Sequence, residues 1–325
     1  MPRKNTLAKS VKRPAASVTH SIDQAFHSLR HPSEPPPVVS ARWLAGSIAV
    51  AVAAAALCGW FTLCFLFWQG SWQLLFHPVS AVTRTPASAG LAFDPVGFAA
   101  ADSGAPRLQG WWIPAAPDAR FGRYTVLYLH GQDGNLTNTV DALVQLHSVG
   151  VNVFAFDYRG YGQSQFTHPS EAHWREDAEW ALQYLTETRH IEAGTIILDG
   201  NQLGANLALE IAAKRTDLAG VILESPLAAP TDAISNDPRA HLVPAHLLVQ
   251  DSFDLNASAE NLQIPSLWFF SEESHQNSGS HEDERASARV TAPAMRVWLP
   301  SKSSGDRQTA LGRWLDDLPA KTKIR

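Results

Sequence analysis

The chain has 325 residues, of which 45% are hydrophobic and 18% are charged, and its formal net charge is -5 at pH 7. This length and apolar content are enough for one large domain with a buried core, which excludes a chain that is disordered over most of its length. The negative net charge gives no general attraction to a polyanion, so we expect no nucleic-acid partner.

The first 42 residues are basic and contain several prolines, ending in the string HPSEPPPVVSAR. A segment of this composition buries too little apolar surface to fold by itself. We therefore predict that residues 1–42 form a tail and not a domain.

The next segment, residues 43–68, contains no Asp, Glu, Lys, Arg or His. At about 1.5 Å per residue, such a run spans the roughly 30 Å hydrocarbon core of a membrane with some tilt. Aromatic anchors near its ends are Trp43, Trp60, Trp68 and Trp72. We predict a transmembrane helix, the alternative being an unusually long buried core helix.

The charges on either side of this run predict its orientation. The cations before it are Arg3, Lys4, Lys9, Lys12, Arg13, Arg30 and Arg42, whereas the first one after it is Arg84. The positive-inside rule then places the N-terminus in the cytoplasm. Because the leader and the apolar core are longer than in a cleavable signal peptide, we expect an uncleaved signal anchor. The main domain of this single-pass membrane protein would then be extracytoplasmic, facing the periplasm if the host is bacterial.

Beyond residue 70, short apolar runs alternate with longer amphipathic segments. A hairpin is expected within 91–115, followed by strands that begin near residues 125, 151, 195, 220, 265 and 295. Helices are expected at 136–149, 170–189, 203–215 and 306–318, and the polar stretch 271–287 is typical of a loop running into a helix. This alternation predicts an α/β fold with a mostly parallel sheet and crossover helices.

The segment LDGNQLGANLALEIAA, residues 198–213, is typical of a strand end, a tight turn and the start of a helix. Gly200, Gln202 and Gly204 have the spacing of the G-x-S-x-G nucleophile elbow. In that elbow the glycines let a strand and a helix approach, and the central residue is held in a strained turn. Here the central residue is an amide and not a nucleophile.

Together these segments resemble the α/β-hydrolase superfamily, and more narrowly a membrane-anchored branch similar to serine aminopeptidase-like and abhydrolase-domain proteins. The resemblance covers about residues 70–318, and its motifs are LYLHGQDGNL at 127, FDYRGYGQS at 156, the elbow at 198, LESPL at 223 and IPSLWFF at 264. It implies an α/β-hydrolase fold over residues 70–325, with a short cap at about 228–262, after the span at 43–68.

The resemblance also implies an oxyanion hole made by two backbone N–H groups. Carried over to this sequence, the donors are Gln132, which follows the His-Gly pair, and Leu203, which follows the elbow residue. Two such donors are worth roughly 3 kcal/mol each in an intact site. The flanking residues His130, Gly131 and Asn201 are candidate ligand-binding residues, although His130 equally suits a role in bracing its loop.

The catalytic triad that the resemblance implies is substituted at all three positions. Gln202 stands at the nucleophile position, and a carboxamide has no proton whose removal would make it an effective nucleophile. Ser274 stands at the acid position and Ser304 stands approximately at the histidine position. No histidine follows His281 anywhere in the chain.

Other residues near these positions have weaker claims to a catalytic role. Glu272 and Glu273 lie next to the acid position. His275 and His281 precede the last predicted strand, so they would serve as a base only through an unusual loop excursion, and we interpret them as solvated loop residues. Ser164 belongs to the FDYRGYGQS turn, where glycines and charged residues usually shape a loop.

The residues give no reason to expect a cofactor or a metal. Cys58 and Cys64 are the only cysteines and both lie in the apolar run, so the domain has neither a disulfide nor a thiolate metal site. His241 and His246 lack ligand spacing with other metal-binding residues.

Two classes of function stay open. The first is a catalytically inactive pseudohydrolase at a membrane, with a binding or regulatory role and a small-molecule or acyl ligand in its pocket. The second is an active serine-hydrolase-like enzyme that cleaves an ester, thioester or amide with non-standard groups. Loss of triad members typically costs ~10⁴ to 10⁶ in turnover, which favours the first. The sequence names no protein partner.

Overall fold

The computed structural model describes residues 39–101, 103–227, 230–249, 251–271, 282–299 and 304–319. The chain divides into two compact units, Met1–Gly59 and Trp60–Arg325. Helix α2, Ala41–Gly70, begins in the first unit and ends in the second. Within the described ranges it is the one helix long and apolar enough to cross a membrane, and almost none of it is covered by protein. The boundaries expected from the sequence remain predictions: a tail at 1–42, a span at 43–68, a domain at 70–325 and a cap at about 228–262.

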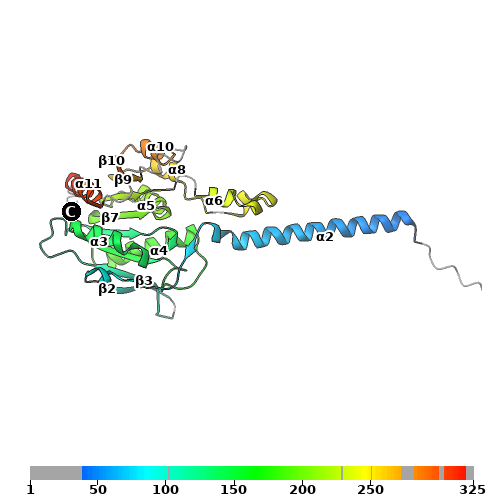
Figure 1. Ribbon diagram of the computed structural model, residues 1–325, viewed down its shortest axis with the longest axis horizontal. Helices are drawn as coiled ribbons and strands as arrows, with labels where there is room; N and C mark the ends of the chain where they lie inside the picture. Colours follow the sequence, from blue (N-terminus) through cyan, green and yellow to red (C-terminus); the bar gives the residue numbers. More distant parts are fainter. Residues whose placement is uncertain are drawn as a thin grey trace, which may run out of the picture. The chain divides into compact units, whose positions relative to one another are not determined.

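An eight-stranded sheet forms the centre of the second unit (Figure 1). Its strands, in chain order, are β2 (Asp94–Ala100), β3 (Pro106–Ile113), β4 (Thr125–Leu129), β6 (Asn152–Asp157), β7 (Ile196–Asn201), β8 (Gly220–Glu224), β9 (Ser266–Ser271) and β10 (Ala294–Leu299). They lie in the order β10-β9-β8-β7-β4-β6-β3-β2. The β2–β3 hairpin is antiparallel and joins β6 in antiparallel register, whereas the other pairs are parallel. The predicted hairpin and mostly parallel sheet are confirmed.

Helices cover both faces of this sheet. Helices α3 (Val140–Val149) and α11 (Ser304–Asp317) contribute to one apolar cluster, and helices α4 (Glu171–Gln183), α5 (Leu203–Lys214), α8 (Leu255–Glu260) and α10 (Glu282–Arg289) contribute to the other. Successive side chains of a strand point to opposite faces, so Val126 and Tyr128 of β4 enter the first cluster and Leu127 and Leu129 enter the second. Burial on both faces explains why the parallel strands are continuous apolar runs.

The four helices expected from the sequence are present. The first is a 3-10 turn, Leu136–Thr139, that continues into α3, and the second is α4 followed by a π-helical turn, Tyr184–Thr188. The third and fourth are α5 and α11, which begin and end within two residues of the expected bounds. The polar stretch after β9 leads to α10, although residues 272–281 lie outside the described ranges.

Shorter elements were not expected from the sequence. Between β8 and β9 the chain forms α6 (Asp232–Ser235), the 3-10 helix η6 (Pro238–Leu242), α7 (Ala245–Leu248) and α8. Elsewhere it forms 3-10 turns at Ser71–Leu74, Pro86–Ala89 and Ala193–Thr195, and a two-stranded pair of β1 (His77–Pro78) with β5 (Asp133–Gly134). Elements of two to six residues are too short to show a hydrophobic period, so pattern alone misses them.

Candidate functional site

The turn between β7 and α5 has the backbone geometry of a nucleophile elbow. Gln202, at its centre, has φ 50° and ψ −117°, a conformation that L-residues rarely adopt. Such a residue costs of order 1–3 kcal/mol and persists only where its surroundings impose it. The Gln202 N–H donates a hydrogen bond to the carbonyl oxygen of Glu224 at 2.9 Å, which ties the turn to the end of β8. The strained turn is therefore present without a serine.

Two glycines make this turn possible because backbone passes within contact distance of each. A Cβ atom on Gly200 would lie 2.2 Å from the carbonyl oxygen of Gly204. A Cβ atom on Gly204 would lie 2.2 Å from the carbonyl oxygen of Leu129 and 2.4 Å from that of His130. The start of α5 thus packs directly on β4 and β7, and the elbow's shape follows from this packing.

A side chain of the protein itself accepts a hydrogen bond from the Leu203 N–H, which is one of the two predicted oxyanion donors. The Leu203 N–H donates to the side-chain Oε1 of Gln132 at 3.3 Å. The carbonyl oxygen of Gln132 accepts hydrogen bonds from the His77 N–H and from the Tyr161 hydroxyl, both at 2.9 Å. Gln132 is therefore fixed by its backbone while its amide oxygen accepts from the donor that would face a substrate carbonyl.

Carboxamides crowd the space around the elbow residue. A Cβ atom on Gly131 would lie 2.9 Å from Oε1 of Gln202, 3.3 Å from the carbonyl oxygen of Asn201 and 3.4 Å from its Oδ1. Gly131, Asn201 and Gln202 are thus neighbours. Their assignment as ligand-binding or substituted catalytic residues stays a prediction. Amides donate and accept hydrogen bonds but neither attack a carbonyl nor take up a proton near neutral pH.

His130 lies buried beneath this group, with 1% of its surface exposed. Its ring packs against Tyr158 and Tyr161 at centroid distances of 4.6 and 5.2 Å. Burial lowers the pKa of His130 to about 4, because the imidazolium would lose its hydration. The neutral ring donates from Nδ1 to the carbonyl oxygen of Gly131 at 2.7 Å. This geometry supports the bracing role for His130.

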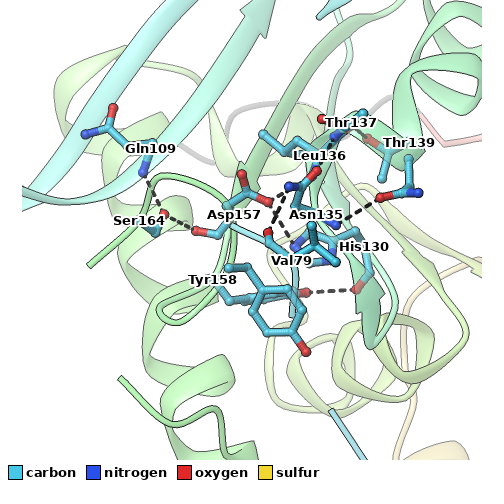
Figure 2. A network of polar contacts seen from close by, with 12 residues as sticks. Val79, Gln109, His130, Asn135, Leu136, Thr137, Thr139, Asp157, Tyr158 and Ser164 are labelled. Carbon is cyan, nitrogen blue, oxygen red and sulfur yellow. Dashed lines mark hydrogen bonds and ion pairs between the residues drawn. The ribbon is translucent and has the colours of Figure 1, made fainter. Parts of the chain in front are cut away.

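A buried carboxyl group faces the other ring nitrogen. Oδ1 of Asp157 lies 3.6 Å from Nε2 of His130 and accepts the Leu136 N–H at 2.8 Å (Figure 2). Burial raises the pKa of Asp157 to about 7. The hydroxyl of Ser164 donates to the carbonyl oxygen of Asp157 at 2.5 Å and accepts from the Gln109 N–H at 3.0 Å. Ser164 thus braces the turn after β6, as its loop composition indicated.

Asn135 fixes the far end of the loop that carries Gln132. Its side-chain nitrogen donates to the carbonyl oxygens of Val79 and Ala81 at 2.8 Å, and its Oδ1 accepts the Thr137 N–H at 2.8 Å (Figure 2). Oδ1 of Asn138 accepts the Asn135 N–H in return at 3.1 Å. The loop is therefore held at both ends.

Of the predicted acid and histidine positions, one lies outside the described residues and the other lies within them. Ser274 lies outside the described residues, as do Glu272, Glu273, His275 and His281. Ser304 is the first residue of α11.

Sequence motifs did not predict a buried charge cluster near the start of α11. Arg307 pairs with Glu224 at the end of β8, and its Nη2 lies 3.6 Å from Oδ2 of Asp199 in β7. Asp199 is fully buried, and within the described ranges its carboxylate oxygens have no hydrogen-bond donor. Burial raises its pKa to about 7, opposed by the charge of Arg307. The acidic residues that end the apolar runs TIILD and GVILE were the available signal.

A groove of about 700 Å³ lies away from the elbow, and its lining includes neither Gln132 nor Gln202. It is bounded by the end of α2 and the turn after it, by the start of α4 with the loop before it, and by Leu248, Val249, Asp251 and Ser252. Trp72 stacks on His168 in its wall at a centroid distance of 4.9 Å. This volume suits a small-molecule ligand.

Comparison with known proteins identifies relatives of part of the chain. Residues 122–263 match the family model described as serine aminopeptidase, S33. The uncharacterized protein YfhR of Salmonella typhimurium is 35% identical over 130 residues, which are 38% of this chain and 41% of that protein. Protein bem46 of Schizosaccharomyces pombe is 35% identical over 114 residues, which are 34% of this chain and 38% of that protein. The matches span about two fifths of these relatives.

Solved structures agree over a longer stretch. An esterase of Pyrococcus furiosus superposes with a TM-score of 0.56 at 17% identity, covering 74% of this chain and 99% of its own. An α/β hydrolase of Vibrio vulnificus superposes with a TM-score of 0.53 at 21% identity, covering 71% of this chain and 81% of its own. At such identities these structures bear on the fold alone. With the family match over residues 122–263, the sheet and the elbow, they show that the chain has the α/β-hydrolase fold.

Proposed function

We propose that this protein is a membrane-anchored pseudohydrolase, which uses a hydrolase fold to bind a ligand or to regulate a partner. The observation that carries the proposal is the hydrogen bond from the Leu203 N–H to Oε1 of Gln132. An amide oxygen of the chain accepts from the donor on which acyl transfer depends, and the residue beside it, Gln202, has no nucleophilic atom.

Among the described residues, the side chains placed next to the elbow residue are carboxamides, which cannot act as a base. His130, on the loop that carries Gly131 and Gln132, is buried, has a low pKa and donates from Nδ1 to the carbonyl oxygen of Gly131. Asp157 lies beneath the same loop and accepts from backbone. Side chains that only donate and accept hydrogen bonds are suited to holding a polar ligand group, such as a carbonyl, without cleaving it.

The proposal is tested by a fluorophosphonate probe, which reacts covalently only with an activated serine. The full chain, in the membrane or in detergent, is expected to remain unlabelled under conditions in which an active serine hydrolase added to the same sample is labelled fully. Stoichiometric labelling of any serine, Ser164 included, would instead support a serine-hydrolase-like enzyme that uses non-standard groups.

Restoring the serine alone is expected to leave the protein inactive. Turnover of a p-nitrophenyl ester by Gln202→Ser should stay within about tenfold of the starting protein, because triad members act as a unit and the base is missing. The double variant Gln202→Ser with Gln132→Ala serves as the matched control, since it also clears the Leu203 N–H. A thousandfold gain in the double variant alone would show that Gln132 was the limiting group. The same gain in the single variant would reveal a hidden base.

We further propose that α2 anchors the protein with its N-terminus in the cytoplasm and its domain outside. The charge asymmetry around residues 43–68 supports this orientation. Protease added to intact spheroplasts, or to intact cells of another host, is expected to digest the domain while a cytoplasmic marker survives. Protection of the domain until the membrane is lysed would reverse the assignment.

A further inference from the structure

The insert between β8 and β9 packs against the end of α2. The part involved, residues 230–249, is called the cap segment below. The indole N–H of Trp60 donates to the carbonyl oxygen of Leu242 at 3.1 Å. Cys64 and Phe67 are buried in one apolar cluster together with three residues of the cap segment: Ile234, Ala240 and Val243. One face of the helix from Trp60 to Gly70 is therefore covered by the cap segment.

The other face of the same turns carries large apolar side chains that the protein leaves bare. The exposed fractions are 62% for Phe61, 54% for Phe65, 59% for Leu66 and 55% for Trp68. A contiguous apolar surface of this kind on a helix long enough to span a membrane is suited to contact with lipid and not with water. Lipid should therefore contact the exposed face of these turns, while the cap segment covers the other face.

The depth of the contact follows from helix geometry. Trp60 precedes the last residue of α2 by ten positions, which at 1.5 Å per residue is about 15 Å along the axis. The 26 residues without charge, 43–68, measure about 39 Å, so a hydrocarbon core of roughly 30 Å centred on them includes Trp60 and Cys64. The carbonyl of Leu242, at this level, has the Trp60 indole as its donor, as a backbone group away from water requires.

The outward surface of the cap segment has the composition of a membrane-surface element. Leu242 and Leu247 are 61% and 70% exposed. Arg239, His241 and His246 are exposed beside them, and Arg239 forms an ion pair with Asp237 of the same segment at 2.8 Å. Short helices that combine bare leucines with basic or titratable groups suit the boundary between lipid headgroups and acyl chains.

We propose that the cap segment lies in the membrane surface, with the side chains of Leu242 and Leu247 inserted among the lipids that surround the end of α2. The inference rests on the proposed membrane anchoring and is independent of whether the protein is catalytic. The occupant of this surface is the bilayer, because the segment packs on turns of a candidate membrane-spanning helix whose remaining side chains are exposed and apolar.

The experiment measures lipid contact at single cysteines in the full chain. In a Cys58→Ala, Cys64→Ala background, Leu242→Cys and Leu247→Cys are labelled with an environment-sensitive fluorophore and reconstituted in phosphatidylcholine vesicles. A fraction of the lipid carries a nitroxide on its acyl chain, which quenches only fluorophores within the bilayer. Labels at both positions are expected to emit at shorter wavelength than in water and to lose most of their fluorescence to the nitroxide lipid.

Two matched labels separate the possible outcomes. Asp118→Cys, exposed in the loop before β4 and so at the opposite end of the parallel strands from the cap segment, should keep its fluorescence. Cys58, retained in a Cys64→Ala chain, reports insertion of α2 and should be quenched. Quenching at Cys58 without quenching at 242 and 247 would overturn the cap inference and leave the anchor intact. No quenching at Cys58 would overturn the anchor itself. A blue-shifted but unquenched label at 247 would show that protein covers the surface, which also overturns the inference.

Discussion

Gly204→Ala is expected to destabilise the domain by at least about 3 kcal/mol, and its soluble yield should fall accordingly. The new Cβ atom would lie 2.2 Å from the carbonyl oxygen of Leu129 and 2.4 Å from that of His130, and both are backbone atoms that cannot rotate away. To relieve this steric overlap, α5 would have to move away from β4. That movement would open the core cluster to which Leu203 and Leu207 of the same helix belong. Urea unfolding of the full chain in detergent measures the loss.

Gly312→Ala is the matched control for this substitution, since it makes the same change within another helix. Gly312 lies inside α11, and nothing is found within 4 Å of its added Cβ atom. Alanine restricts the unfolded chain more than glycine, so this variant should be about 0.5–1 kcal/mol more stable than the starting protein. If both variants lost stability equally, close packing at the elbow would not be the cause of the first result.

Arg159→Met is the second change from which we expect a large effect, a loss of about 3–5 kcal/mol at pH 8. Nε of Arg159 lies 2.5 Å from Oδ1 of Asp177, and the Arg159 N–H donates to Oδ2 at 2.8 Å. The Asp177 carboxylate is fully buried, so removing the guanidinium leaves a buried charge with backbone donors only. Methionine keeps much of the side-chain volume, which limits the change to the charge and its hydrogen bonds.

The loss should be smaller at pH 5 than at pH 8. Burial already raises the pKa of Asp177 to about 6, against the opposing effect of Arg159, and removal of Arg159 raises it further. A carboxyl group with a raised pKa contributes stability below its unfolded pKa and loses that contribution as the pH rises through its folded pKa. The variant therefore falls further below the starting protein as the pH increases. Urea midpoints at the two pH values measure this difference.

The exposed pair of Arg84 with Asp141 provides the control for charge removal. Its ion pair is 2.7 Å long, but the two side chains are 40% and 73% exposed. Arg84→Met should leave the urea midpoint nearly unchanged at both pH values, because water replaces the lost partner. A pH-independent loss in Arg159→Met would instead assign its effect to packing, since Arg159 also lies over the Trp180 ring.

Most of the sheet was predictable from the sequence because its strands are buried on both faces. Segments such as Thr125–Leu129 have no charged position to interrupt the apolar run, and parallel strands of this kind are recognised by composition. The elbow backbone was predictable for a different reason, since the spacing of Gly200 and Gly204 reports a close approach that only glycine permits. Short sequence patterns were therefore enough to predict the sheet and the elbow backbone.

The polar contacts of the site were not predictable in the same way. Gln132 and Leu203 are 71 positions apart, and their hydrogen bond depends on the rotamer of one side chain. Arg307 reaches Glu224 across 83 positions. A cap was expected at about 228–262, but its helices of four and five residues were not, because elements this short carry no usable period and are stabilised by packing on α2. Such contacts depend on which distant residues the fold brings together, and no short sequence motif predicts them.

The strained backbone at Gln202 has a consequence for mutational tolerance. The glycines on either side impose the conformation, and the Gln202 side chain makes no capping hydrogen bond to the helix that follows. The identity of the central residue therefore matters little to folding, whereas positions 200 and 204 admit glycine only. In a saturation library selected for folded protein, tolerance should peak at position 202 and vanish two residues to each side. Selection for hydrolysis in a working enzyme of this fold would make that central position intolerant as well.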